Sequence, residues 1–214
     1  MPQEGILLEL HYLPCIQYFS KWYSHKSVCI EQHENYSKGS YRNRAHIAGA
    51  NGILRLSIPL EKGKNEQQSI QEVKIAYHEK WQQQHWASIQ SAYGNAPYFE
   101  FYADEFVPHY QQKYTYLFEF NKALLETILA QLQFSAKTHW TSKYEQEVEK
   151  KGLLDFRNGI FPKKHRQKED IHFKVKPYPQ VFSEKNGFLP NLSILDLLFC
   201  TGPQASLLLE ACVP

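Results

Sequence analysis

The sequence predicts an α/β or α+β fold, with a mixed sheet built from the N-terminal third and helices packed on it, in a single domain over residues 1–214. Short apolar runs, which are typical of strands, recur through residues 6–77, and amphipathic helical patterns follow over residues 78–133. A chain of 214 residues with 43% hydrophobic and 14% aromatic residues can bury one large core. The aromatic excess predicts that some rings line a pocket.

The opening stretch combines a strand with the start of a helix. Residues 7–10 are an apolar run typical of a buried strand, and Pro14 suits the first position of a helix. His11 and Tyr12 therefore lie in a strand-to-helix turn. In open α/β sheets such turns collect ligand groups, and the following helix offers free N–H groups to an anion. We expect the turn to belong to a site.

Further strands are predicted over residues 28–30, 43–47, 53–58 and 73–77. The turn signal Ala50-Asn51-Gly52 joins the second and third of these into a hairpin. Alternation of apolar and polar residues predicts the last one.

Helices are predicted over residues 78–93, 97–110 and 114–133. Near the C-terminus Ser193 is placed to cap a helix, and Asp196, three residues later, to reach back to the cap. A last helix starts at Pro203 and has so few polar positions that we expect it to be buried. Residues 135–176 have two open interpretations, a solvated linker or a flap that orders over a bound anion, and composition favours the linker.

Composition and missing motifs exclude several classes of protein. The net charge of +2 gives no field that would attract nucleic acid, and no stretch approaches the roughly 18 apolar residues that a membrane span needs. The start of the chain has no basic segment of a signal peptide, and the four cysteines show no zinc or disulfide spacing. Phosphate-loop, dinucleotide and nucleophile-elbow motifs are absent from the sequence. We expect a cytoplasmic protein with neither metal nor cofactor.

Several motifs, in one order, make the sequence similar to a known family. They are His11-x-x-Pro14-x-x-x-Tyr18-Phe19, Arg42-Asn43-Arg44, Trp81…His85…Tyr93, Ala96-Pro97-Tyr98-Phe99, Asp155-Phe156-Arg157, Pro162-Lys163-Lys164 and Gly187-Phe188-Leu189-Pro190-Asn191 through to Phe199. The chain resembles the WbqC-like protein family over nearly its whole length. The resemblance implies a place among proteins of O-antigen and surface-polysaccharide assembly, and a role in transferring glycine or another acyl group onto an amino sugar.

A basic cluster is the first candidate for substrate binding. It consists of Lys38, Arg42, Asn43 and Arg44. If a strand begins at Arg42, then Arg42 and Arg44 point to one face and form a clamp for the phosphate of a nucleotide-linked or lipid-linked sugar. The alternative is a surface face paired with carboxylates such as those of Glu31 and Glu34.

His11 is the candidate catalytic residue, as a general base for an amine nucleophile, and the alternative is a histidine hydrogen-bonded at a strand end. Further candidates for substrate binding are Tyr12, Tyr18, His85, Lys163 and Lys164. The aromatic rings would stack on the substrate and the lysines close over phosphate, whereas core packing and solvated charges are the alternatives. The leading hypothesis is an acyl or aminoacyl transferase for a phosphate-bearing sugar. The other is a scaffold in envelope assembly whose surface recognises a protein or phospholipid head groups, through peripheral membrane contact.

Overall fold

The computed structural model describes residues 4–61, 68–134 and 136–214. Its strands are β1 (Gly5–Glu9), β2 (Ser27–Glu31), β3 (Arg44–Gly49), β4 (Gly52–Ser57), β5 (Lys137–Trp140) and β6 (Leu153–Asp155). The α-helices are α1 (Ile16–Ser24), α2 (Trp81–Tyr93), α3 (Phe99–Gln111), α4 (Leu117–Leu132), α5 (Ser183–Asn186), α6 (Ile194–Thr201) and α7 (Ala205–Ala211). Short 3-10 turns are η1 (Tyr41–Asn43), η3 (Ile70–Glu72), η4 (Glu149–Lys151), η5 (Lys164–Arg166) and η6 (Gly202–Gln204).

The main sheet is parallel and has the strand order β5-β2-β1-β6. All five residues of β1 are buried, as expected for a central strand that is covered on both faces. The chain runs from β1 to β2 and β5 in one direction and returns to β6 on the other side of β1. The strand order therefore reverses between β1 and β6, which is where open α/β sheets bind ligands, beyond the carboxyl ends of their strands.

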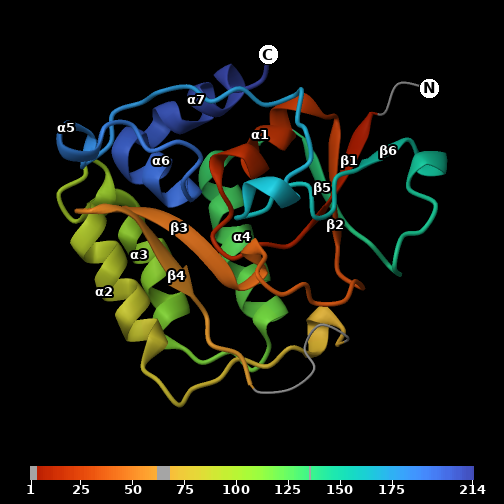
Figure 1. Cartoon of the computed structure of the whole chain (residues 1–214), viewed down its shortest axis with the longest axis horizontal. Helices are drawn as coiled ribbons and strands as arrows, with labels where there is room; N and C mark the ends of the chain where they lie inside the picture. The colour runs from red at the N-terminus through yellow and green to blue at the C-terminus, as the bar shows by residue number, and fades with distance from the viewer. Residues whose placement is uncertain (1–3, 62–67, 135) are drawn as a thin grey trace.

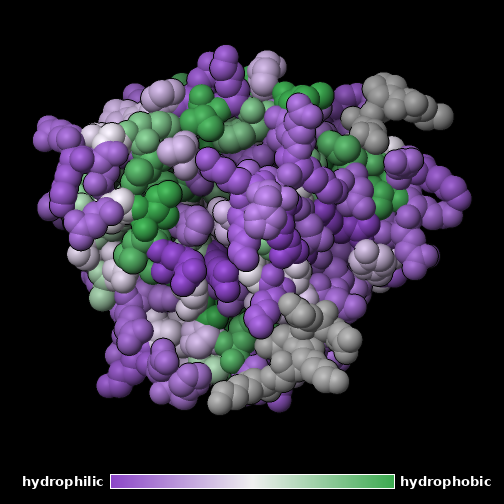
Figure 2. All heavy atoms as spheres, in the orientation of Figure 1, coloured by the Kyte–Doolittle hydropathy of each residue, from purple (hydrophilic) through white to green (hydrophobic). Residues whose placement is uncertain are grey.

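The predicted hairpin is confirmed as β3 and β4, which pair antiparallel. It forms a two-stranded sheet of its own, which lies in front of α4 and packs on α2 and α6 (Figure 1). Ile53 and Leu54 of β4 are exposed, and Figure 2 shows hydrophobic residues over the hairpin on a face that is otherwise largely hydrophilic. The mixed α/β class is thus confirmed, but its parallel and antiparallel strands are separate sheets.

The main sheet also draws strands from outside the N-terminal third. Its two edge strands, β5 and β6, come from the 136–176 segment, for which a linker is the interpretation favoured by composition. Edge strands bury little apolar surface, and in β5 exposed residues alternate with half-buried ones. The sequence of β5 therefore carries little apolar signal, and β6, with two leucines and an aspartate, is too short to show a strand pattern. The strand expected over 73–77 is wrong: Val73 and Ile75 are buried, but only the isolated bridges Lys74↔Tyr116 and Leu60↔Ile75 occur there.

The three predicted central helices are confirmed as α2, α3 and α4. Figure 1 shows α4 between the main sheet on one side and the α2 and α3 pair on the other. Its buried stripe forms the centre of the core and consists of Leu117, Phe118, Phe120, Asn121, Leu124, Leu125, Ile128 and Leu132.

The C-terminal helices close the core. Ser193 caps α6 by accepting from Leu195 N, as expected. The side chain of Asp196 does not reach back to the cap. It is buried and therefore needs hydrogen-bond donors, which are Tyr178 Oη at 2.5 Å and Gln180 Nε2 at 2.8 Å. The last helix is buried on one face only, since Leu209 is covered while Leu207 is 67% exposed.

One helical stretch, Ile194–Ala211, has the length and composition that a membrane crossing needs, which the sequence interpretation did not anticipate. It is 61% buried inside the fold and includes the η6 break. A core helix passes the same test, so this stretch does not establish a membrane span.

Candidate functional site

Carboxylates end three adjacent strands of the main sheet. Glu9 is the last residue of β1, Glu31 of β2 and Asp155 of β6. Glu9 and Glu31 are register partners, and Asp155 is paired with Leu7. Parallel strands bring these residues to one edge, which we call the acidic edge. The side chains of Glu9 and Glu31 are buried, whereas that of Asp155 is 38% exposed.

His11 and Arg42 converge on Glu9. His11 Nε2 lies 2.9 Å from Glu9 Oε1, and Arg42 NH1 lies 3.8 Å from the same oxygen. The backbone N–H of Asn158 donates to Glu9 Oε2 at 2.8 Å. Arg42 Nε and NH2 donate to the two oxygens of Glu34 at 2.7 and 2.5 Å. Glu9, His11, Glu34 and Arg42 form a buried unit, named here the His11–Arg42 cluster.

A second guanidinium serves the other two carboxylates. Arg157 donates from Nε and NH2 to both oxygens of Asp155, at 2.9 and 2.7 Å, and from NH1 to Glu31 at 3.1 Å. Glu31 also accepts from Thr141 Oγ1 at 2.8 Å. The Arg157 side chain is 10% exposed, so this part of the acidic edge reaches the surface.

The acidic edge and Glu34 place carboxylates next to cations. The carboxylates of Glu9, Glu31, Glu34 and Asp155 lie near the guanidinium groups of Arg42 and Arg157 and the ammonium group of Lys168. Burial raises the pKa of Glu34, and the charges of Glu9 and Glu31 raise it further. Burial also opposes ionisation of Glu9, but Arg42 and His11 outweigh it and hold that pKa below its usual value. The carboxylates of Glu9, Glu31 and Asp155 favour a cationic ligand such as an ammonium group.

The geometry of His11 suits a general base. Its ring lies against Tyr18 and Tyr41, with centroids 5.0 and 5.6 Å apart, and Tyr18 Oη donates to Glu9 O at 3.0 Å. Glu9 orients the ring through Nε2, while Nδ1 has no hydrogen-bond partner within the described ranges. A nitrogen held in this way can accept a proton. The side chain is 1% exposed, so a substrate reaches Nδ1 only when part of this shell moves.

The helix after the turn offers no anion site, contrary to expectation. The first N–H groups of α1 already have acceptors: Ile16 N donates to Leu192 O at 3.0 Å, and Gln17 N donates to Asn191 Oδ1 at 2.9 Å. The C-terminal segment therefore takes the place that an anion would occupy.

The structure does not form the expected arginine clamp. Strand β3 begins at Arg44, and Arg42 lies before it in η1, so alternation along a strand does not relate the two side chains. Arg42 is buried against Glu34, the pairing that was the alternative, although inside the protein rather than on its surface. Arg44 is half-buried. Asn43 links β4 to the core, because its Nδ2 donates to Ile58 O at 2.9 Å.

The other expected binding residues lie in different places. Lys38, Lys163 and Lys164 are exposed. Tyr12 Oη lies 2.9 Å from both His85 Nδ1 and Tyr110 Oη, in an aromatic cluster with Phe120. Burial lowers the pKa of His85 to about 4, so this histidine is neutral at pH 7.

Sequence analysis missed the carboxylate partner of His11. The partner of His11 is Glu9, which also accepts from the backbone of Asn158, and the Asp155–Arg157 pair at the same edge was missed as well. A glutamate directly after an apolar run, in Leu7-Leu8-Glu9 and again in Cys29-Ile30-Glu31, is the signal that could have revealed the acidic edge.

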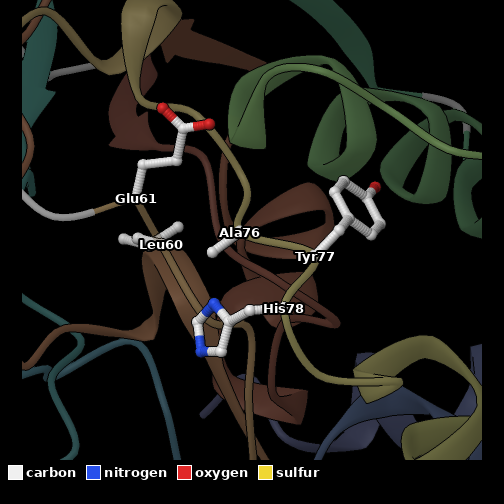
Figure 3. A pocket seen from close by; sticks show the side chains of 5 residues that line it. All are labelled: Leu60, Glu61, Ala76, Tyr77 and His78. Carbon is white, nitrogen blue, oxygen red and sulfur yellow. The ribbon is translucent and has the colours of Figure 1, made fainter.

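Two described hollows lie elsewhere on the molecule. One of about 600 Å³ is lined by Leu60, Glu61, Ala76, Tyr77 and His78 (Figure 3). Another, of about 390 Å³, adjoins it at Tyr77 and follows the start of α2 and the end of α3. Neither is lined by His11 or Arg42.

These features describe an α/β protein with a buried ionic network beyond the carboxyl ends of its parallel strands. The chain belongs to the WbqC-like protein family, whose model matches residues 10–159. The matched region contains His11, Arg42 and Arg157. The chain is also 25% identical to the uncharacterized protein Rv1507c of Mycobacterium tuberculosis (strain ATCC 25618 / H37Rv), over 96% of this chain and 97% of that protein. No solved structure matches the chain.

Proposed function

We propose that this chain is a transferase of surface-polysaccharide assembly that moves an acyl or aminoacyl group onto the amine of an amino sugar. Family membership supports the polysaccharide setting through the family's name. The carboxylates at the acidic edge support an amine-bearing acceptor, because negative charge attracts an ammonium group.

The observation that carries the proposal is the His11–Glu9 pair at the carboxyl edge of the sheet, with Nδ1 left without a partner within the described ranges. The bound ammonium group first gives one proton to solvent. The free amine nitrogen then attacks the carbonyl carbon of an activated acyl donor, such as a thioester, and the new C–N bond forms. The bond from that carbon to the leaving group breaks. His11 Nδ1 takes the proton from the amine and returns it to the leaving thiolate, while Glu9 stabilises the imidazolium.

The fold changes the role of the arginines in this proposal. Arg42 is buried and forms ion pairs with Glu34 and Glu9, so in this proposal it sets the charge around His11 rather than holding phosphate. Arg157, at the rim, is the guanidinium nearest the surface in this network. Phosphate groups of a nucleotide-linked or lipid-linked sugar are therefore not assigned to the predicted clamp.

A binding comparison and a transfer assay test the proposal. A nucleotide-linked amino sugar should stabilise the protein against heat, by about 2.7 kcal/mol at 100 times its Kd, and the N-acetylated form, which has no ammonium group, should not. With an acyl-thioester donor, His11→Gln should lower kcat by about 100-fold or more and leave the far-UV spectrum unchanged. The exposed His139 provides the control variant His139→Gln. Equal stabilisation by the N-acetylated sugar, or a fully active His11→Gln variant, would contradict the proposal.

The second candidate is a scaffold in envelope assembly, and the closed state of the cluster favours it. The side chains of His11 and Arg42 are 1% and 0% exposed, as they would be if the network served only to hold the strand ends together. This candidate predicts that no sugar or acyl donor changes the melting temperature, whereas Arg42→Ala still destabilises the fold.

A further inference from the structure

A pocket of about 390 Å³ lies between the start of α2 and the end of α3, away from the acidic edge. Its walls combine aromatic rings, amides and a few charges. The lining residues are Tyr77, Glu79, Lys80, Trp81, Gln82, Gln83, Tyr110, Gln111 and Lys113. Aromatic surface with a small number of polar groups is the chemistry of sites for small molecules.

Hydrogen bonds to the backbone fix the inner walls. Tyr77 Oη donates to Tyr114 O at 2.9 Å and accepts from Tyr114 N at 3.0 Å, so its ring is held at a set angle. Gln82 Nε2 donates to His109 O and Gln112 O, at 3.2 and 2.6 Å. A ligand therefore meets preformed walls, which lowers the entropy lost on binding.

The wall also holds a polar group without a partner. Trp81 is 2% exposed, and its Nε1–H has no acceptor within the described part of the chain. The indole packs between Tyr77 and Phe120, with centroids 6.0 and 5.4 Å away. A buried donor without an acceptor is costly, and this nitrogen meets a ligand only if the packing around it opens.

We infer that this pocket binds a single sugar ring. A pyranose presents C–H groups on its faces, which suit the half-buried ring of Tyr77 beside Lys113, and hydroxyls on its rim, which suit the amides of Gln83 and Gln111. The ring and the amides together distinguish the pocket from a site for a simple anion. The hollow of Figure 3 shares Tyr77 with the pocket.

A hydrogen bond joins the pocket to the strand-end turn. Tyr110 lines the pocket, and its Oη lies 2.9 Å from Tyr12 Oη. Tyr12 follows His11 in the chain, and its hydroxyl also contacts His85. The inference deepens the proposed function. That the bound sugar is part of the acceptor rests on the proposed function, whereas the binding of a sugar in this pocket does not.

The test uses small sugars and pocket-filling variants of the full chain. Methyl glycosides of glucose, galactose and N-acetylglucosamine are titrated by saturation-transfer NMR, with inorganic phosphate as the anion probe. Gln83 and Gln111 are exposed lining residues, so Gln83→Trp and Gln111→Trp fill the pocket without disturbing the core. Gln90, exposed on the same helix α2 but outside the pocket, supplies the control Gln90→Trp.

At least one glycoside should bind, and both filling variants should weaken its binding tenfold or more, while Gln90→Trp binds as the original chain does. The inference is overturned if no glycoside binds, if filling leaves glycoside affinity unchanged, or if phosphate alone binds and is lost on filling. The titrations contain no acyl donor, so they test sugar binding separately from transfer. If the protein binds sugar in this pocket but transfers no acyl group, this inference stands and the transferase proposal fails.

Discussion

Glu9 and Glu31 are register partners on neighbouring parallel strands, yet their carboxylates are held by different arginines. Arg42 NH1 lies 3.8 Å from Glu9, and Arg157 NH1 lies 3.1 Å from Glu31. Like charges placed side by side on adjacent strands repel, more strongly when buried. Arg42, from the segment before β3, and Arg157, from the segment after β6, therefore offset the repulsion between these two glutamates.

Replacing Arg42 tests this dependence. Arg42→Ala leaves Glu34 and Glu9 buried without their guanidinium, so we expect a loss of about 3–5 kcal/mol in the free energy of unfolding. Urea denaturation at pH 7 measures the loss. Arg55, exposed on β4, gives the control Arg55→Ala, which should change stability by no more than about 0.5 kcal/mol. A loss below about 1 kcal/mol for Arg42→Ala would mean that the cluster contributes little to folding.

His85 makes the stability fall as the solution becomes acidic. Burial lowers its pKa from 6.5 to about 4. Above pH 6.5 the ring is neutral in both the folded and the unfolded state and does not affect stability. Between pH 6.5 and 4 the ring is protonated in the unfolded chain but stays neutral in the folded protein. The free energy of unfolding should drop by about 3 kcal/mol over this window, since one pKa unit corresponds to 1.36 kcal/mol. Denaturation curves of His85→Gln at pH 7 and pH 4 should show a smaller drop than the original chain, and an equal drop would refute the assignment.

Asn191 holds the start of α1 through its side chain and has a left-handed backbone, with φ at 53°. Asn191→Gly removes the hydrogen bond to Gln17 N but adds no backbone strain, because glycine adopts a positive φ freely. It should lower the free energy of unfolding by about 1 kcal/mol. Asn191→Ala adds the strain of a positive φ, and we expect roughly 1 kcal/mol more. Thermal unfolding of the two variants separates the contributions. Equal melting temperatures would show that the backbone here relaxes.

Gly202 should be intolerant of a side chain. Its φ is +55°, and a Cβ added there would lie 2.5 Å from the ring of Tyr98. Gly152 gives the comparison: its φ of 69° and ψ of 22° are left-handed helical and nothing lies within 4 Å of the added Cβ, whereas Gly202 has a ψ of −127°, which favours glycine alone. Gly152→Ala should therefore cost about 1–2 kcal/mol, and Gly202→Ala clearly more, because its backbone is more strained and the ring must also move. Similar losses for both would mean that Tyr98 shifts freely.

Periodicity predicted those parts of the fold whose burial is local. The hairpin of β3 and β4 and the helices α2, α3 and α4 follow from apolar spacing within each segment. The turn at His11 was also placed correctly, at the carboxyl end of a strand. Its partner Glu9 was missed because a single charge at the end of an apolar run appears, in sequence, to mark where the strand leaves the core.

Features made by distant segments could not be predicted in this way. β5 is a short edge strand of mostly polar residues and β6 has only three residues, so only pairing with β2 and β1 makes them strands. The clamp required a strand that begins at Arg42, but β3 begins two residues later, at Arg44, and Arg42 lies in η1. The hydrogen bond from Gln17 N, at the start of α1, to Asn191 joins residues far apart in the sequence, so no local pattern predicts it.

The dependence of the first helix on Asn191 and Leu192 has a consequence for synthesis on the ribosome. β1 and α1 leave the exit tunnel early, but β1 gains one flanking strand only from residues 153–155, and α1 gains its N-terminal acceptors only from residues 191 and 192. The N-terminal segment must therefore wait, with its apolar strand incompletely covered, until nearly the whole polypeptide has been made. Chains that end prematurely expose this strand and become substrates for chaperones and proteases.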